Sequence, residues 1–239
     1  MQILEGEKVT KHFGGLAAVN RVDFDINQGE VVGLIGPNGA GKTTLFNLIS
    51  GSLPATSGEI RYKGKRITGL KPHRICKMGV ARTFQSAKLF AGLTVLDNAL
   101  AASLFGTKRA ISVPDAQREA EALLDFVELS SVGAMQAKDL PIASRKRLEV
   151  ARALATKPDL LMFDEVMAGL NSAEVSQAME LITKIRHKGI TIFMIEHVMK
   201  AIMNICDRII VLHHGSKIAE GTPEEIASSP TVVEVYLGE

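Results

Sequence analysis

The sequence is poor in cysteine, and this sets its first limits. Its 239 residues include two cysteines, Cys76 and Cys206, which lie far apart and form no C-x-x-C pair. That spacing excludes a disulfide framework and favours reduced thiols, as in a cytosolic protein. We interpret both cysteines as small buried hydrophobic residues. Internal repeats and low-complexity tracts are also absent from the sequence, which excludes repeat architectures.

Long apolar runs and a secretion signal are lacking as well. No uninterrupted apolar stretch approaches the about 18 residues that a membrane-spanning helix requires. Met1 is not followed by a charged segment and then an apolar one, as it would be in a signal peptide. We therefore expect that the chain neither crosses a membrane nor is exported by the usual route. Any role at a membrane then requires a partner.

The excess of charge of one sign is small. The sequence has 28 Lys and Arg against 26 Asp and Glu, a net charge of +2, so the composition gives no reason to expect nucleic acid as a partner. We expect the run Arg145-Lys146-Arg147 to be a solvated helix face. What is present, 46% hydrophobic and 23% charged residues, is typical of a globular protein with a sizeable core in one large or two modest domains.

The most informative stretch is a glycine-rich loop between an apolar run and a helical pattern. Residues 31–35 are apolar, residues 36–44 read GPNGAGKTT, and residues 45–49 have helical spacing. The loop fits G-x-x-x-x-G-K-[ST], in which glycines let backbone N–H groups turn around phosphate oxygens at a helix N-terminus. This pattern predicts a nucleotide site, with Lys42 reaching the β- and γ-phosphates and the Thr43 hydroxyl on Mg²⁺. A plain glycine-rich turn is the alternative.

Strand patterns occur on both sides of a helical region. Antiparallel β structure is expected at residues 3–26 and 59–65, further strands at residues 79–84, 158–165 and 190–195, and a terminal hairpin at residues 208–219. Helices are expected at residues 95–105 after Thr94, at 115–129 and 143–155, and after the capping residues Asn171 and Thr222. The alternation predicts an α/β sheet covered by helices, with a helical insertion between two strand regions.

Several polar residues follow the predicted strands directly. The glycine-rich loop, Gln85, the pair Asp164-Glu165 and His197 each lie just past a strand end. Ligands of open α/β sheets bind at the carboxyl ends of the strands. We therefore expect these residues to converge on one edge of the sheet.

The residue types at this edge suit phosphoryl transfer, which needs charge neutralisation, Mg²⁺ and an oriented water. Asp164 is expected to bind Mg²⁺, Glu165 can polarise water, and His197 can hold the γ-phosphate or the water in line. Taken singly, an acid pair at a strand end is commonly a helix cap, and a lone histidine is usually a structural residue. Their occurrence together and in this order favours a catalytic site.

With these motifs in place, the whole chain resembles the ATP-binding subunits of ABC transporters. The shared motifs are, in family order, an aromatic residue at Phe13, Walker A at 36–44, the Q-loop at Gln85, Walker B at 160–165, the D-loop at 168–171 and the switch histidine at His197. The resemblance implies an α/β fold, namely a P-loop NTPase core with a mainly parallel sheet, an N-terminal antiparallel β subdomain and an inserted helical subdomain.

The resemblance also implies a domain division and a set of site residues. It implies one ATP-binding domain over residues 1–239, in which 1–85 and 157–239 form the nucleotide-binding core with the β subdomain and 86–156 form the helical subdomain. The residues expected to bind ATP are Phe13, Val19, Gly36, Pro37, Asn38, Gly39, Ala40, Gly41, Lys42, Thr43, Thr44 and Gln85. The magnesium ligands are expected to be Thr43, Gln85 and Asp164, the catalytic residues Glu165 and His197, and the D-loop Ala168, Gly169, Leu170 and Asn171.

Within the family, three stretches resemble the ATPases of branched-chain amino-acid importers: residues 11–16, Glu196-His197 and residues 233–239. This implies a peripheral ATPase on the cytoplasmic face of the membrane. With a second ATPase subunit it would drive two permeases that a periplasmic solute-binding protein supplies. The alternatives are an ABC ATPase for lipid or polysaccharide export and a module that binds ATP without hydrolysing it. Glu165 and His197 argue against the latter, because a pure binder needs neither.

One motif departs from the family pattern. Where the family has a signature close to Leu-Ser-Gly-Gly-Gln, this chain has Leu140 followed by Pro141, Ile142, Ala143 and Ser144. In the family that serine and the glycine N–H groups bind the γ-phosphate held by the opposite subunit, and proline lacks both the hydroxyl and the N–H. A helix N-terminus remains, and proline suits a first helical turn. We therefore expect a heterodimer with a partner of intact signature, in preference to a homodimer with two weak sites.

A short apolar patch follows the Q-loop. Leu89, Phe90 and Leu93 lie close together within residues 88–100, and exposed apolar patches commonly mark protein interfaces. We expect this segment to contact a permease, with simple packing between subdomains as the alternative.

Overall fold

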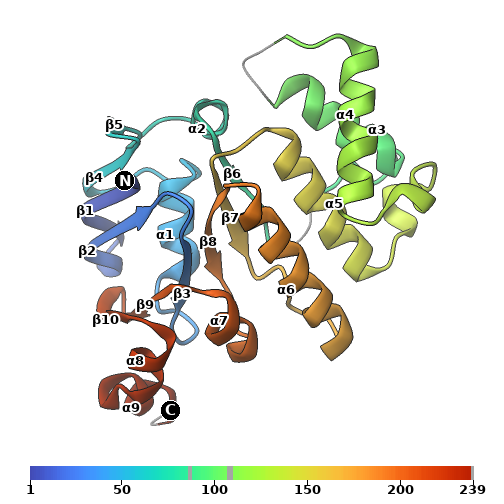
Figure 1. Ribbon diagram of the computed structural model, residues 1–239. Coiled ribbons are helices and arrows are strands. Elements are labelled where there is room, and N and C mark those ends of the chain that lie inside the picture. The colour runs from blue at the N-terminus through green and yellow to red at the C-terminus, as the bar shows by residue number, and fades with distance from the viewer. Residues whose placement is uncertain (86–87, 107–109, 238–239) are drawn as a thin grey trace.

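The computed structural model describes residues 1–85, 88–106 and 110–237, whose arrangement is shown in Figure 1. Four strands form an antiparallel sheet in the order β2-β1-β4-β5. Their bounds are Gln2–Phe13 for β1, Leu16–Asn27 for β2, Ser57–Tyr62 for β4 and Lys65–Arg66 for β5. The antiparallel β structure expected in this part of the chain is confirmed.

A second sheet, of six strands, has the order β10-β9-β3-β8-β7-β6. Five neighbouring strands run parallel, and β10 pairs antiparallel with β9 at one edge. The bounds are Val31–Ile35 for β3, Val80–Arg82 for β6, Leu160–Asp164 for β7, Thr191–Ile195 for β8, Arg208–His213 for β9 and Ser216–Gly221 for β10. The mainly parallel α/β sheet predicted from the sequence is confirmed.

The central strands are buried on both faces, because successive side chains alternate between two cores. In β8, Ile192 and Met194 belong to one core and Phe193 and Ile195 to the other. Helix α1 (Lys42–Ile49) lies between the two sheets (Figure 1) and adds Phe46 to the second core. The ring centroids of Phe46 and Phe193 are 4.9 Å apart. The helix that follows the glycine-rich loop is therefore packed on both sides.

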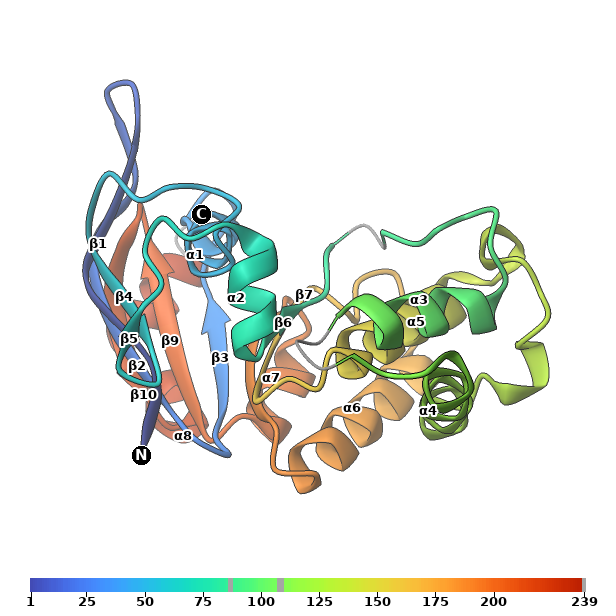
Figure 2. The same cartoon turned by 90° about the horizontal axis from the view of Figure 1, so that it is seen from above.

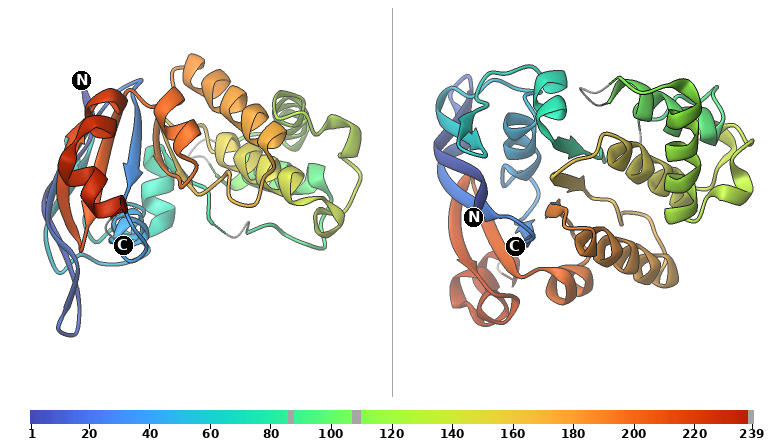
Figure 3. Two further views of the ribbon diagram at one scale, coloured as in Figure 1. Left: turned by 90° about the horizontal axis from the view of Figure 1, so that it is seen from below. Right: turned by 45° about the horizontal axis from the view of Figure 1, so that its top comes forward.

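Most of the helices lie on the other face of the parallel sheet or beyond it. Between β6 and β7 the chain forms α3 (Val95–Phe105), α4 (Val113–Phe126), two short 3₁₀ turns (Ser130–Val132 and Ala137–Asp139) and α5 (Ile142–Ala155). Figure 2 shows this helical part standing to one side of the sheets. The other helices are α2 (Pro72–Met78), α6 (Ser172–His187), α7 (Met199–Ile205), α8 (Pro223–Ser228) and α9 (Pro230–Leu237). Figure 3 shows α8 and α9 beside β10, on the side away from the helical part.

Helix starts were predictable where a side chain caps the helix. Thr94 caps α3, and the Asn171 and Thr222 side chains form capping boxes with Glu174 and Glu225 at the starts of α6 and α8, so these three predictions are confirmed. The helix expected from residue 115 instead begins at Val113, because Ser112 is its cap. The strand expected over 79–84 is limited to three residues, since β6 pairs with β7 only over those.

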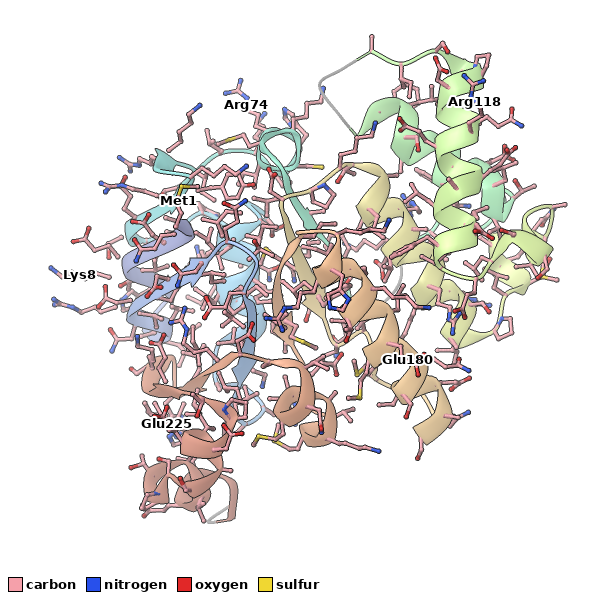
Figure 4. The ribbon with its side chains drawn as sticks, viewed as in Figure 1. Met1, Lys8, Arg74, Arg118, Glu180 and Glu225 are labelled. Carbon is pink, nitrogen blue, oxygen red and sulfur yellow. The ribbon has the colours of Figure 1, made fainter. Side chains whose placement is uncertain are left out.

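One charge prediction is wrong in part. Arg145 is exposed, as expected, whereas Lys146 and Arg147 are partly buried, because Lys146 donates to the Glu165 carbonyl and Arg147 to Gln177. Other charges do point outward from separate parts of the molecule, as the labelled side chains in Figure 4 show.

The cysteine and membrane expectations can also be compared with the structure. Both cysteines are free; Cys206 is buried as expected, whereas Cys76 is only half-buried. Among the described residues, no helix combines the length and the apolar composition that crossing a bilayer requires.

Candidate active site

The predicted site residues come from loops at one edge of the parallel sheet. The loop 36–41 follows β3, Gln85 follows β6, Asp164 ends β7, and His197 lies two residues after β8. Because β3, β8, β7 and β6 are parallel neighbours, their carboxyl ends lie side by side. The structure thus brings these loops together, as expected from the sequence.

The glycine-rich loop depends on two glycines that neighbouring backbone approaches closely. Gly36 has φ of 150°, and a Cβ there would lie 2.1 Å from the Leu212 carbonyl oxygen. Gly41 has φ of 103°, and its Cβ would lie 2.4 Å from the carbonyl oxygen of Ala18. Side chains at either position would collide with main chain. The loop is therefore held between strands β9 and β2.

Lys42 is the first residue of α1, and its side chain folds back over the glycine-rich loop. Its Nζ donates to the carbonyl oxygens of Gly36 at 2.5 Å and Pro37 at 2.9 Å. Burial lowers the pKa of Lys42, while the nearby carboxylates of Glu165 and Asp164 act in the opposite direction. Both carboxylates of the predicted catalytic edge therefore act electrostatically on this ammonium group.

Asp164 is buried and forms an ion pair with Arg82 through one of its carboxylate oxygens. Arg82 Nη2 lies 2.6 Å from Asp164 Oδ2, with the two side chains only 6% and 3% exposed. The other guanidinium nitrogen, Nη1, donates to Asn47 at 2.7 Å and to Ser50 at 3.1 Å. Asp164 Oδ1 is buried and has no hydrogen-bond partner among the residues that the structure describes. One oxygen of Asp164 is therefore fixed, and the other remains available to a ligand.

Glu165 lies between two of the other predicted site residues. Its Oε2 accepts a hydrogen bond from Gln85 Nε2 at 2.7 Å, and its Oε1 lies 3.0 Å from His197 Nε2. These contacts join the loops after β6, β7 and β8. The Glu165 side chain is 13% exposed and that of His197 47%, so the carboxylate is largely shielded but reachable from solvent beside the histidine.

Phe13 and Val19 were predicted at the nucleotide from the family resemblance, and they differ in exposure. Phe13 lies near the tip of the β1–β2 hairpin, which projects from the molecule in Figures 2 and 3, and it is 47% exposed. Lys11 Nζ lies 5.1 Å from its ring centroid. Val19 is fully buried and has no surface to offer a ligand in this conformation. Phe13 therefore exposes about half of its surface beside Lys11, whereas Val19 is part of the core beneath the hairpin.

The divergent signature segment forms the start of α5. Pro141 is the N-cap of this helix rather than part of its first turn, and no side chain caps the helix. The first intrahelical hydrogen bond runs from Arg145 N to the Pro141 carbonyl. The N–H groups of residues 142–144 therefore have no acceptor within the helix. Ile142 is 59% exposed. The helix end thus presents N–H groups and an apolar side chain.

The predicted D-loop residues connect the segment that carries Asp164 and Glu165 to α6. Ala168 and Gly169 are exposed, Leu170 packs against the core, and Asn171 caps α6 by accepting from Ala173 N and Glu174 N, each at 3.0 Å. Asn171 therefore has a structural contact in this chain.

Three charged residues at the site were missed by sequence reasoning. Arg82 interrupts an apolar strand, which is a signal that was available; Lys146 was assigned to a solvated face; and Glu196, though next to His197, received no role. Glu196 is 2% exposed, and burial raises its pKa to about 7. The position of these residues depends on contacts between elements far apart in sequence.

Comparison with known proteins gives consistent matches. A family profile described as "ABC transporter" matches residues 19–168, and one described as "Branched-chain amino acid ATP-binding cassette transporter" matches residues 216–239. The chain is 41% identical over 250 residues to the high-affinity branched-chain amino acid transport ATP-binding protein BraF of Pseudomonas aeruginosa, with 99% of this chain and 98% of the relative covered. It is 43% identical over 240 residues to LivG, described in the same words, of Escherichia coli strain K12, covering 95% and 94%.

Solved structures agree over the full length of the chain. A nucleotide-free ATP-binding cassette from an ABC transporter superimposes with a TM-score of 0.90 at 32% identity, covering 100% of both chains. An ATP-binding cassette of an ABC transporter in its ADP conformation gives a TM-score of 0.90 at 34% identity, again covering 100% of both chains.

Proposed function

Because the chain belongs to the ABC transporter family of ATP-binding proteins, we propose that it hydrolyses ATP to energise the uptake of branched-chain amino acids through partner permeases. The observation that carries the catalytic part is the placement of Glu165 between Gln85 and His197. A carboxylate fixed in this way can accept a proton from an attacking water. His197 then holds the water or the γ-phosphate in line.

We assign nucleotide binding to the glycine-rich loop and to Phe13. Residues 36–44 supply N–H groups and the α1 N-terminus for the phosphates, and Lys42 supplies the positive charge. Phe13 stacks on the base. Val19, fully buried, acts through the hairpin that carries Phe13. We also propose that residues 1–85 and 157–239 form the nucleotide-binding core and that residues 86–156 form a helical subdomain.

The residues at the edge of the sheet also fit Mg²⁺. Asp164 Oδ1 is a buried carboxylate oxygen with no partner among the described residues, and hard oxygen atoms are the ligands that Mg²⁺ prefers. We propose that Asp164, Thr43 and Gln85 hold the ion. When bound, Mg²⁺ neutralises charge on the β- and γ-phosphates. Arg82 binds Asp164 Oδ2, and this leaves Oδ1 for the ion.

The choice of amino acids as cargo rests on the relatives and on the C-terminal match. BraF and LivG are named as branched-chain amino acid transport ATP-binding proteins, and the description of the profile over residues 216–239 also names branched-chain amino acids. This favours amino-acid import over lipid or polysaccharide export. Of the closing residues that resembled importer ATPases, Gly238 and Glu239 lie outside the described part of the chain.

A groove between the core and the helical part is the surface we propose for the permease. Its lining includes Phe84, Lys88, Phe90 and Phe105, with Arg152 from α5. Phe90 is 50% and Phe105 77% exposed. Within the segment 88–100, Leu89 instead packs against the core. An apolar groove with basic residues fits a protein partner. A permease bound in this groove would hold the chain peripherally at the cytoplasmic face of the membrane.

A transport assay tests the proposed function directly. The chain is co-expressed with its permeases and second ATPase, reconstituted in liposomes with the solute-binding protein, and supplied with ATP and labelled leucine. We expect ATP-dependent uptake of leucine, and no uptake of a labelled basic amino acid in the same vesicles. Uptake that proceeds without this chain, or export of lipid in its place, would contradict the proposal.

We further propose a heterodimer with one strong and one weak ATP site. The family signature binds the phosphate held by the opposite subunit, and Pro141 removes a hydroxyl and an N–H from it. Each hydrogen bond to a charged phosphate contributes roughly 1.5–3 kcal/mol, or about ten- to a hundredfold in binding. Glu165 of this chain would then act opposite the intact signature of the partner.

Mixing experiments check this asymmetry. We expect the purified chain alone to hydrolyse ATP about tenfold more slowly than its mixture with the partner ATPase. The double variant Pro141→Ser, Ala143→Gly should recover much of that difference without the partner, whereas Met135→Gln, an exposed change in the same helical part, should not. Equal rates of ATP hydrolysis for the chain alone and for the mixture would contradict the heterodimer proposal.

A further inference from the structure

Two charged side chains flank the segment that links Walker B to the D-loop, and the function proposed above uses neither. Lys146 comes from the second turn of α5, and Glu196 from the residue after β8. They reach the main chain of residues 165–167 from different elements. This segment carries the carboxylate assigned as general base, so its anchoring bears on catalysis.

The main chain of Glu165 has an unusual conformation. Its φ is +54°, in the left-handed region that residues with a Cβ adopt at an energetic cost. Its N–H donates to the Ile195 carbonyl at 2.9 Å, and its carbonyl accepts from Ala168 N at 3.2 Å. A left-handed residue persists where the surroundings hold it, so the contacts of this segment decide where the carboxylate points.

Lys146 supplies one of those contacts. Its Nζ donates to the Glu165 carbonyl oxygen at 2.9 Å. Burial lowers the pKa of Lys146, and the carboxylates of Glu196, Glu149 and Glu165 oppose that effect. The ammonium group thus brings a charge-assisted hydrogen bond to the one carbonyl that belongs to the catalytic residue itself.

Glu196 supplies the contact on the other side. Its Oε1 accepts from Met167 N at 2.8 Å, and the side chain is almost fully buried. Glu196 immediately precedes His197, whose Nε2 lies 3.0 Å from Glu165 Oε1. One buried carboxylate is therefore tied both to the turn after Glu165 and to the histidine that faces it.

We infer that Lys146 and Glu196 are positioning residues that hold the backbone of Glu165–Met167, and so keep the Glu165 carboxylate between Gln85 and His197. The inference rests on the proposed role of Glu165 in ATP hydrolysis. Neither residue touches the reacting groups in this arrangement. Both act through main-chain hydrogen bonds, at the Glu165 carbonyl and at the Met167 amide.

Steady-state kinetics of the complete transporter tests this. We expect Lys146→Met and Glu196→Leu each to lower kcat about ten- to a hundredfold, the range for losing a hydrogen bond to a charged group, with KM for ATP within about twofold of the wild type. Lys146→Arg should restore most of the rate, because it keeps a cationic donor. Glu196→Gln should keep more activity than Glu196→Leu, because its amide oxygen can still accept from Met167. Lys184→Met, at an exposed position of α6, is the matched control.

Amide hydrogen exchange of the same proteins gives a readout that does not depend on turnover. Glu196→Leu should speed exchange in the peptide that contains Met167, since its N–H loses its acceptor, and leave the central peptide of α6 unchanged. Exchange at wild-type rates in that peptide would overturn the inference.

The kinetic outcomes separate the inference from the proposed function. A wild-type transporter that turns over, with Lys146→Met and Glu196→Leu equally fast, overturns the inference alone. Loss of kcat together with weaker ATP binding and no rescue by Lys146→Arg indicates a purely structural role and also overturns it. A wild-type transporter that hydrolyses no ATP overturns the proposed function, and the inference with it.

Discussion

The Glu165→Gln variant is expected to hydrolyse ATP about a hundred- to ten-thousandfold more slowly than the wild type, while still binding the nucleotide. Glutamine keeps the length of the side chain but cannot accept a proton. The carboxylate has contacts on both oxygens, with Gln85 at 2.7 Å and His197 at 3.0 Å, so the substitution removes the base from a position that is otherwise retained. Single-turnover hydrolysis by the assembled transporter, with nucleotide binding measured in parallel, checks both parts.

The matched control for this variant is Glu180→Gln. Glu180 is an exposed residue of α6 (Figure 4). The Glu180→Gln substitution removes the same charge from the chain but lies outside the site, so turnover should be unchanged. If Glu165→Gln turned over at the control rate, Glu165 would not be the general base. Loss of nucleotide binding in Glu165→Gln would instead point to a binding role.

The second large effect concerns stability. Arg82→Met should lower the free energy of unfolding by about 3–5 kcal/mol, because it leaves the buried Asp164 carboxylate without its cation. The two side chains are only 6% and 3% exposed, with 2.6 Å between Arg82 Nη2 and Asp164 Oδ2. The guanidinium carbon also lies 5.6 Å and 5.2 Å from the ring centroids of Phe46 and Phe84, so methionine retains part of the packing. Urea unfolding in the absence of nucleotide measures the change.

Two further variants show whether the lost pairing causes the effect. The double variant Arg82→Met, Asp164→Asn should be more stable than Arg82→Met alone, because it removes the uncompensated charge. Arg118→Met breaks an exposed pair with Asp115, and exposed pairs contribute only about 0–1 kcal/mol. A similar loss of stability in Arg118→Met and Arg82→Met, or no recovery in the double variant, would contradict this account of Arg82.

Local signals in the sequence account for the parts of the fold that were predicted well. Helix caps at Thr94, Asn171 and Thr222 involve a side chain and a backbone amide a few residues away, so the sequence specifies them directly. The glycine-rich loop is similar, because the conformation and space at Gly36 and Gly41 demand glycine. Helices α2 and α7 escaped prediction since each has only seven residues, and such short helices depend on tertiary packing.

Contacts between distant elements account for what the sequence could not reveal. The partner of Arg82 lies 82 positions along the chain, and only the pairing of β6 with β7 brings the two together. Lys146 was misjudged because consecutive helical residues point in different directions, so one member of a charged run can face inward. Glu196 follows an apolar strand, and its buried carboxylate accepts from the amide of Met167, 29 positions earlier in the chain.

The hydrogen bonds of Lys42 have a consequence for what ATP binding must accomplish. Its ammonium bonds the carbonyls of Gly36 and Pro37, so the side chain ties the end of the loop to its start. The conformational entropy lost in ordering those residues is therefore lost during folding and does not reduce the affinity for ATP. In return, the lysine must exchange partners when it reaches a phosphate. Its contribution to affinity is a difference between two sets of hydrogen bonds and is smaller than the new contacts alone would indicate.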